Sequence, residues 1–238
     1  HTIKLYIKRC KGDSQMQYSL IVQKLQEYRK KSQILQTEMA EYLDITQSEY
    51  SRIELGKSKL PYDVLDKLRK RGCDIDMLII GVETGTVLPS VEKVYVESDT
   101  PKFVSWLKLC EWAMHHWRNE DGREAEIGSK LLKVFVNDEK GLTALEKLRT
   151  ASGISQEKMV EILGVNIKKY RRLEKGIIQL DAELMAKIYE ATKCKPSFFL
   201  DENNYYLSLI SEECRYGEKR EEQLQDLLSM QEKFEVNE

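Results

Sequence analysis

A repeat at one fixed spacing constrains this chain more than any other feature. The stretch ISQEKMVEILGVNIKKYRRLEKG spans residues 154–176, and LQTEMAEYLDITQSEYSRIELG spans residues 35–56. Seven identities are related by the same offset of 120 residues. Gln36, Met39, Leu43, Tyr50, Arg52, Glu54 and Gly56 recur as Gln156, Met159, Leu163, Tyr170, Arg172, Glu174 and Gly176. An offset that never changes predicts a duplicated structural unit.

The second copy reads as two short helices joined by a tight turn. Ser155 marks the start of a helix whose apolar residues recur on one face. Gly164 ends that helix, and Asn166 is placed to cap the next one. Tyr170 and Leu173 are predicted to be buried, which leaves most of the second helix outside. Two helices joined in this way form a helix-turn-helix.

These residues resemble the Cro/C1-type repressors, also called the XRE family. The family pattern has a Leu-Arg pair in its first helix, a Gln opening the second, a Gly turn, and Glu-x-Gly ending the third. The second copy supplies Leu148-Arg149, Gln156, Gly164 and Glu174-Lys175-Gly176. The first copy supplies Tyr28-Arg29, Gln36 and Glu54-Leu55-Gly56. The resemblance covers about residues 21–81 and 141–200, roughly half of the chain.

The first copy departs from the pattern at its turn, where Asp44 replaces the glycine. Asp adopts a left-handed conformation more readily than most residues, so we expect the turn to be kept. The Arg and the Glu stand 25 positions apart in both copies. The resemblance implies that they pair to tie the first helix to the third.

The composition and the positions of proline and glycine predict an all-α protein of two repeat domains with helical connections. Only four prolines and twelve glycines interrupt a periodic leucine pattern in 238 residues. We expect lambda-repressor-like four- or five-helix domains joined by a helical hairpin, with a C-terminal helical extension. The predicted parts are an N-terminal arm over 1–20, a first domain over 21–81, a linker with the hairpin over 82–140, a second domain over 141–200 and an acidic extension over 201–238.

The charge is divided unevenly among these parts, although the chain as a whole carries only −2. Counted as Lys and Arg minus Asp and Glu, the five segments carry +3, +1, −3, +4 and −7 in chain order. Positive charge therefore gathers on the arm and the second domain, and the tail is acidic. A local basic face is what contact with phosphates requires, whatever the total charge.

Outside the repeats, residues 2–9 and 91–96 alternate as strands do, and they could pair in a small ribbon. A mobile basic arm or a disordered end is an equal alternative for the first stretch. Thr100-Pro101 predicts a helix start, and an apolar stripe with Trp106 and Trp117 runs from there to about residue 119. A second helix over about 123–136 could complete a hairpin.

The apolar surface of these parts exceeds what two small domains can cover, so we expect contacts beyond the repeats. The hairpin is predicted to pack on a repeat domain or on its copy in another subunit. A charged helix over about 218–235 docks on its own domain or pairs between chains. The prediction favours a homodimer formed through the Trp106/Trp117 helix or the C-terminal helix.

Enzymatic and metal chemistry find little support in the sequence. It contains no GxxxxGK[ST], GxSxG or HExxH motif. Cys110, His115 and His116 lie close together but project in different directions from one helix, so no metal site and no cofactor are expected. The five scattered cysteines indicate reduced thiols, and no apolar run has transmembrane length. The prediction is a cytoplasmic, nucleoid-associated protein without enzymatic activity.

The resemblance implies which residues of the second copy contact double-stranded DNA. Gln156, next to Ser155 at the helix start, would donate to a phosphate. The second helix of the pair would enter the major groove, and its groove-facing residues would be Asn166, Ile167, Lys168, Lys169 and Arg172. Arg171 and Lys175 would contact the DNA backbone.

The same logic transfers to the first copy, with Gln36 at a phosphate and Gln47, Ser48, Glu49 and Arg52 in the groove. Residues 46–56 hold one Arg against two Glu, whereas residues 166–176 hold five cations against one Glu. The second copy is therefore predicted to be the main anchor. The first copy either reads bases weakly or binds protein.

The sequence thus predicts a bacterial or phage-type transcriptional regulator, specifically a repressor that binds an operator in double-stranded DNA. Its two domains could span two half-sites about 34 Å apart, as a dimer of single-domain repressors does. Alternatively, each subunit of a homodimer reads one half of a palindrome. The rival reading is a protein-interaction module, or an antitoxin that represses its own operon, with the helix-turn-helix domains as scaffolds.

Overall fold

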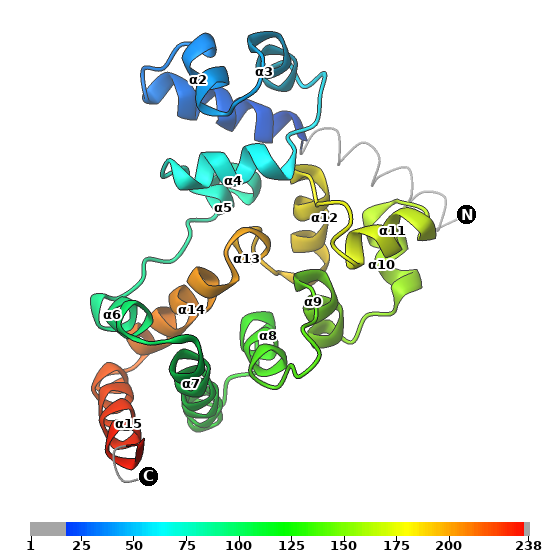
Figure 1. The fold of residues 1–238 in the computed structure, drawn as a ribbon. Coiled ribbons are helices and arrows are strands. Elements are labelled where there is room, and N and C mark those ends of the chain that lie inside the picture. The colour runs from blue at the N-terminus through cyan, green and yellow to red at the C-terminus, as the bar shows by residue number, and fades with distance from the viewer. Residues whose placement is uncertain (1–17, 236–238) are drawn as a thin grey trace. The chain divides into compact units, whose positions relative to one another are not determined.

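The computed structural model describes residues 18–235, with side chains as far as residue 229, and every regular element in that range is a helix (Figure 1). The predicted all-α class is confirmed. The chain forms two compact units that interleave along the sequence. The first unit contains the described residues up to Thr84 together with Glu157–Leu200, and the second contains Gly85–Gln156 with the described residues from Asp201 onward. The predicted domain limits stay predictions.

The first unit combines helices from both repeats. Residues 18–31 are helical, and α2 (Gln36–Tyr42), α3 (Gln47–Glu54), α4 (Tyr62–Lys70) and α5 (Ile75–Ile80) follow. The second repeat adds α10 (Gln156–Leu163), α11 (Ile167–Glu174), α12 (Ala182–Thr192) and α13 (Ser197–Leu200). Helices α2, α3 and α4 start 120 residues before α10, α11 and α12. The offset of 120 seen in the sequence thus also relates the starts of these helices.

The closing helix of the first copy, α5, turns an acidic residue inward. It ends at Gly81, which adopts a left-handed conformation with φ of 74°. Met77 on this helix is 37 % exposed, whereas Asp76 beside it is fully buried. Asp76 turns inward because Ser197 meets it there: its carboxylate accepts hydrogen bonds from the Ser197 amide at 2.8 Å and the Ser197 hydroxyl at 2.7 Å.

Helices of each repeat pack against helices of the other repeat near this contact. Helix α5 of the first repeat packs against α12 of the second, and α13 of the second packs against α4 of the first. The backbone joins them as well, because the amide of Ala182 donates to the carbonyl of Leu60 at 3.0 Å. The two repeats therefore share one core in the first unit.

The second unit is built around α14 (Glu202–Tyr216), which packs against four other helices. These are α6 (Pro89–Glu97), α7 (Thr100–Glu120), α8 (Ile127–Val136) and α15 (Arg220–Glu235), and α9 (Ala144–Ser152) packs on α8. Helices α7 and α8 form the predicted hairpin. Nine of the fifteen residues of α14 are buried, so the first part of the predicted acidic extension is the central element of this unit.

One local prediction in the second unit is wrong. Residues 91–96 form part of α6 instead of a strand, because Val91 and Val94 lie one helical turn apart and bury one face. The partner stretch 2–9 lies outside the described residues. The predicted helix start at Thr100-Pro101 is confirmed: Thr100 is the first residue of α7, and Asp99 caps the helix by accepting from the Lys102 amide.

The tryptophan face of α7 is covered within the chain. Trp106 is 2 % exposed and Trp117 is 5 % exposed, because α8, α14 and α15 pack against this helix. The indole nitrogen of Trp117 also donates to Gln223 on α15 at 2.9 Å. The prediction that this face pairs two subunits is therefore corrected: its side chains form the core of the second unit.

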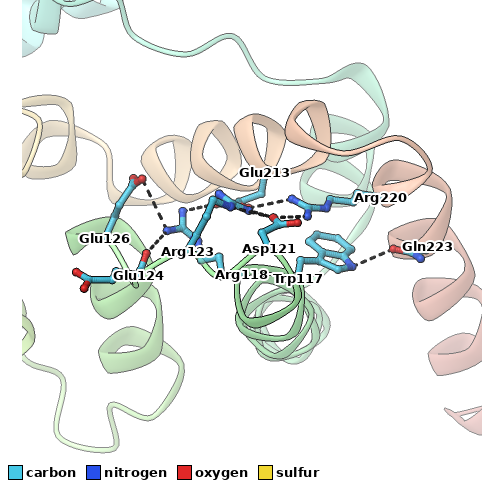
Figure 2. Close-up of polar contacts among 9 residues, drawn as sticks. All are labelled: Trp117, Arg118, Asp121, Arg123, Glu124, Glu126, Glu213, Arg220 and Gln223. Atoms are coloured by element: carbon cyan, nitrogen blue, oxygen red, sulfur yellow. Dashed lines mark hydrogen bonds and ion pairs between the residues drawn. The ribbon is translucent and has the colours of Figure 1, made fainter.

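Charged side chains close the end of this unit, where α7 turns toward α8 (Figure 2). Glu213 on α14 accepts from Arg118 and from Arg123, the latter at 2.8 Å. Asp121 accepts from Arg123 at 2.9 Å and from Arg220 at 2.6 Å. Glu213, Arg118 and Arg220 are buried, and buried ion pairs of this kind specify a geometry more than they add stability. It fixes the ends of α7 and α15 on α14.

Candidate nucleic-acid interface

The first copy contains a helix-turn-helix formed by α2 and α3. Between them Asp44 adopts a left-handed conformation with φ of 53°, so the turn is kept without glycine as predicted. The Ile45 amide donates to the carbonyl of Ala40 at 3.0 Å and closes the end of α2. Thr46 then caps α3, because its hydroxyl accepts from the Glu49 amide at 3.2 Å. The N-terminal residues of α3 consequently face away from the core.

A buried carboxylate fixes α3 to the rest of this copy. Arg29 donates twice to Glu54, at 2.6 and 3.2 Å, which confirms the predicted pair in the first copy. Tyr50 and Gln36 donate to the same carboxylate at 2.7 and 2.8 Å. Burial raises the pKa of Glu54, but these donors outweigh it and hold the pKa below its ordinary value. Glu54 therefore remains ionised, and it orients both helices of the motif.

The second copy repeats this local geometry along α10 and α11. Gly164 in the turn has φ of 63°, and Asn166 caps α11 by accepting from the Lys169 amide at 2.8 Å. Tyr170 donates to Glu174 at 2.9 Å, as Tyr50 does to Glu54. The Arg149–Glu174 pair stays a prediction.

One repeated contact was missed by the sequence reasoning. Lys67 on α4 donates to the carbonyl of Leu43 at 2.7 Å, and Lys187 on α12 donates to the carbonyl of Leu163 at 3.4 Å. These four residues also obey the offset of 120. Each lysine binds the C-terminal end of the helix before the turn, where a cation is favourable. The identity of Lys67 and Lys187 at this offset was the signal that could have revealed the contact.

The structure brings the predicted DNA-contacting residues of the second copy to one exposed segment. Within residues 166–176, Tyr170, Leu173 and Glu174 are buried, whereas all predicted contact residues of this segment are exposed: Asn166, Ile167, Lys168, Lys169, Arg171, Arg172 and Lys175. Ser155 is exposed and Gln156 is half-buried at the start of α10. The segment therefore presents five exposed cations and no exposed acid.

The corresponding segment of the first copy is equally exposed but carries no net charge. Gln47, Ser48, Glu49 and Arg52 are exposed on α3. Because Glu54 is buried, Arg52 and Glu49 are the only exposed charges of residues 46–56, and they cancel. Gln36 is half-buried, and its side chain bridges α2 and α3 by donating to Glu54 and accepting from Gln47 at 3.4 Å. One of its amide hydrogens therefore serves the fold.

The other candidate chemistry is not assembled. Cys110 is fully buried on α7, and burial raises the pKa of its thiol well above the ordinary value. His115 and His116 are exposed on the same helix. The described residues contain no group of three or more His, Cys, Asp or Glu side chains that could hold a metal ion. In the part of the chain that the structure describes, no helix is long and apolar enough to cross a membrane.

Comparison with protein families agrees with the geometry of the first copy. A helix-turn-helix family model matches residues 25–71, from within the first helix to the residue after α4. This part of the chain is therefore a helix-turn-helix domain, and such domains belong to DNA-binding regulatory proteins. The match suggests a DNA-binding transcription regulator. No curated protein and no solved structure matched the chain.

Proposed function

We propose that this protein is a sequence-specific transcriptional repressor that binds double-stranded DNA with two helix-turn-helix copies, chiefly the second. The observation that carries the proposal is the exposed face of α11. Four exposed cations lie on this helix and a fifth, Lys175, directly follows it; in this motif the helix after the turn enters the major groove. Phosphate neutralisation by Lys and Arg supplies most of the affinity of such proteins.

The residues divide into two roles by position. Asn166 at the N-cap of α11 faces the base edges, together with four residues of the helix itself: Ile167, Lys168, Lys169 and Arg172. Lys and Arg read guanine, Asn reads adenine, and Ile167 contacts a thymine methyl group. Ser155, Gln156, Arg171 and Lys175 hold the DNA backbone, which sets the register of the helix in the groove. In the first copy Gln36 contacts a phosphate, while Gln47, Ser48, Glu49 and Arg52 read bases.

The resemblance to Cro/C1-type repressors supports repression of transcription as the mode of regulation. A protein bound across an operator excludes other proteins from the same DNA. Such a regulator acts in the cytoplasm of a bacterium, on the nucleoid.

The test is selection from a pool of random duplex DNA at two salt concentrations, followed by sequencing of the retained duplexes. We expect enrichment of a defined motif at both concentrations. Retention without a motif, lost steeply as salt rises, would mean that only backbone attraction exists. No retention would refute the proposal and favour the second candidate.

The second candidate is a protein-interaction module, including an antitoxin that represses its own operon. The uncharged exposed face of α3 favours it for the first copy, because a phosphate-binding surface needs local positive charge. Under this candidate, replacing Gln47 and Arg52 with Ala would weaken capture of a protein partner and leave DNA retention unchanged. Under our proposal, the same replacements change which sequences are enriched.

A further inference from the structure

We infer that a single chain acts as an internal dimer and reads one composite DNA site made of two unlike half-sites. This inference rests on the proposed function and specifies its DNA target. In single-domain repressors, two separate subunits place two recognition helices on the DNA. Here, the second repeat takes the place of the second subunit, and the contacts between the two repeats are the evidence for it.

The packing between the repeats has the reciprocal form of a twofold interface. In such an interface, a contact from element i to element j is matched by one from j to i. Helices α4 and α12 are equivalent in the two repeats, and so are α5 and α13. The observed pairs are α5 with α12 and α13 with α4, which are each other's counterparts. The two repeats therefore face each other as two subunits do.

Polar contacts at the centre fix the geometry of this interface. Asp76 lies at the start of α5 and Ser197 at the start of α13, and the Asp76 carboxylate binds both the amide and the hydroxyl of Ser197. The Thr84 hydroxyl donates to the same carboxylate at 3.0 Å. Because Asp76 is fully buried, any other relative placement of the repeats would take away the two donors that Ser197 supplies and leave only the Thr84 hydroxyl.

Contacts at the edge make the interface unsymmetrical. Lys59 binds Asp181 at 3.3 Å and Glu183 at 2.8 Å. At the offset of 120, the residue equivalent to Lys59 is Gln179 and the residue equivalent to Asp181 is Pro61. This ion pair therefore has no counterpart in the sequence. The interface therefore favours pairing of a first repeat with a second repeat over pairing of two identical repeats.

Each recognition helix is connected to this interface through its own repeat. Lys67 joins α4 to the end of α2, and Lys187 joins α12 to the end of α10. Since α4 and α12 both take part in the interface, α3 and α11 belong to one compact unit. Such a unit suits two half-sites at a fixed spacing and on one face of the duplex.

The two half-sites must differ because the two helices carry different chemistry. The α11 segment offers cations, which read guanine. On α3, Gln47 is suited to adenine and Glu49 to the amino group of cytosine. The α11 half-site provides most of the affinity, and the α3 half-site adds selectivity.

The test uses the full chain and duplexes built from the motif that selection recovers. We expect one chain per duplex by native mass spectrometry, with both half-sites protected from cleavage. Inserting five base pairs between the half-sites should lower the affinity at least tenfold, to that of the α11 half-site alone. The Gln47→Ala/Glu49→Ala variant should bind the composite duplex with an affinity lowered by the same factor. Its affinity for the α11 half-site alone should not change.

Two chains on a palindromic duplex, or an affinity that ignores the insertion, would overturn the internal dimer while leaving a DNA-binding regulator. Failure to retain any DNA would overturn both.

Variants of the interface provide a separate check. Asp76→Ala removes the acceptor for Ser197 and should abolish the dependence on spacing while the α11 half-site is still bound. Asp76→Asn retains a carbonyl acceptor and should preserve that dependence. Asp63→Ala, at an exposed acid of α4, is the matched control for loss of charge. Preserved spacing dependence in a folded Asp76→Ala variant would count against the interface.

Discussion

The exposed cations of α11 allow a quantitative prediction. Lys168, Lys169 and Arg172 are exposed on this helix, and none of them forms part of the buried side made by Tyr170 and Leu173. Replacing all three with Ala should therefore leave the fold intact, because surface substitutions away from special contacts usually change stability by about 0.5 kcal/mol or less each. DNA binding, by contrast, should fall sharply.

The magnitude follows from counterion release. Each neutralised phosphate contributes about 0.9 to the slope of log affinity against log salt concentration. If all three side chains meet phosphates, the triple variant loses about 2.7 from this slope. Between 50 and 200 mM salt, the ratio of wild-type to variant affinity would then shrink about 40-fold. Side chains that read bases instead would cost about 1–3 kcal/mol for each bidentate contact, with a smaller effect on the slope.

The assay is fluorescence anisotropy on the selected duplex across this salt range. The matched control is Lys108→Ala/Lys130→Ala/Lys133→Ala, which removes the same charge from exposed positions on α7 and α8. The control should bind nearly as the wild type does. If the α11 variant keeps both its affinity and its salt slope, or if the control loses as much, the assignment of the groove face to α11 is refuted.

Three further predictions concern the buried charges. Glu54→Ala leaves Arg29 without its buried partner and should lower the free energy of unfolding by about 3–5 kcal/mol, measured by urea denaturation. Because the pKa of Glu54 is lowered in the folded protein, the stabilisation by Glu54 is fully present above its ordinary pKa and should fade as pH drops through its folded-state pKa. An equal loss of stability at every pH would contradict this reading. Burial raises the pKa of Asp76, so its ionisation opposes folding, and Asp76→Asn should gain stability relative to wild type as pH rises from 4 to 7; a flat difference would refute it. Glu213→Ala leaves the buried Arg118 without its buried carboxylate partner and should destabilise the second unit by about 3–5 kcal/mol, detected by hydrogen exchange of α7 and α14, whereas unchanged exchange would contradict the role of the network.

The repeat unit could be predicted from sequence because its signals are local. Asp44 takes the left-handed turn conformation in one copy as Gly164 does in the other, and Asn166 caps α11 as its position predicts. The exposed side of α11 also follows from helical spacing alone, since burying Tyr170 and Leu173 exposes the residues between them. Each of these features depends on neighbours within one or two turns of helix.

The remaining structure depends on contacts that local patterns do not encode. Residues 91–96 read as a short strand-like run, but Val91 and Val94 are spaced for one face of a helix, and that face packs in α6, which contacts α14. The apolar face of α7 predicted a partner, but only the tertiary structure identified that partner as the same chain. Similarly, nothing in the sequence around Asp76 indicates that its carboxylate meets Ser197, because 121 residues separate the two. The contact between the repeats was therefore beyond sequence reasoning.

The covalent link between two repeats that already face each other has a consequence for protein concentration. Separate repressor subunits must first associate, so their active form is lost on dilution. Joining both halves in one chain replaces this association with an intramolecular step, whose effective concentration reaches the millimolar range for short flexible linkers and does not change with dilution. As an internal dimer, the protein would occupy its DNA, at low occupancy, in proportion to its own concentration, whereas separate subunits that must first pair would occupy it in proportion to the square of theirs.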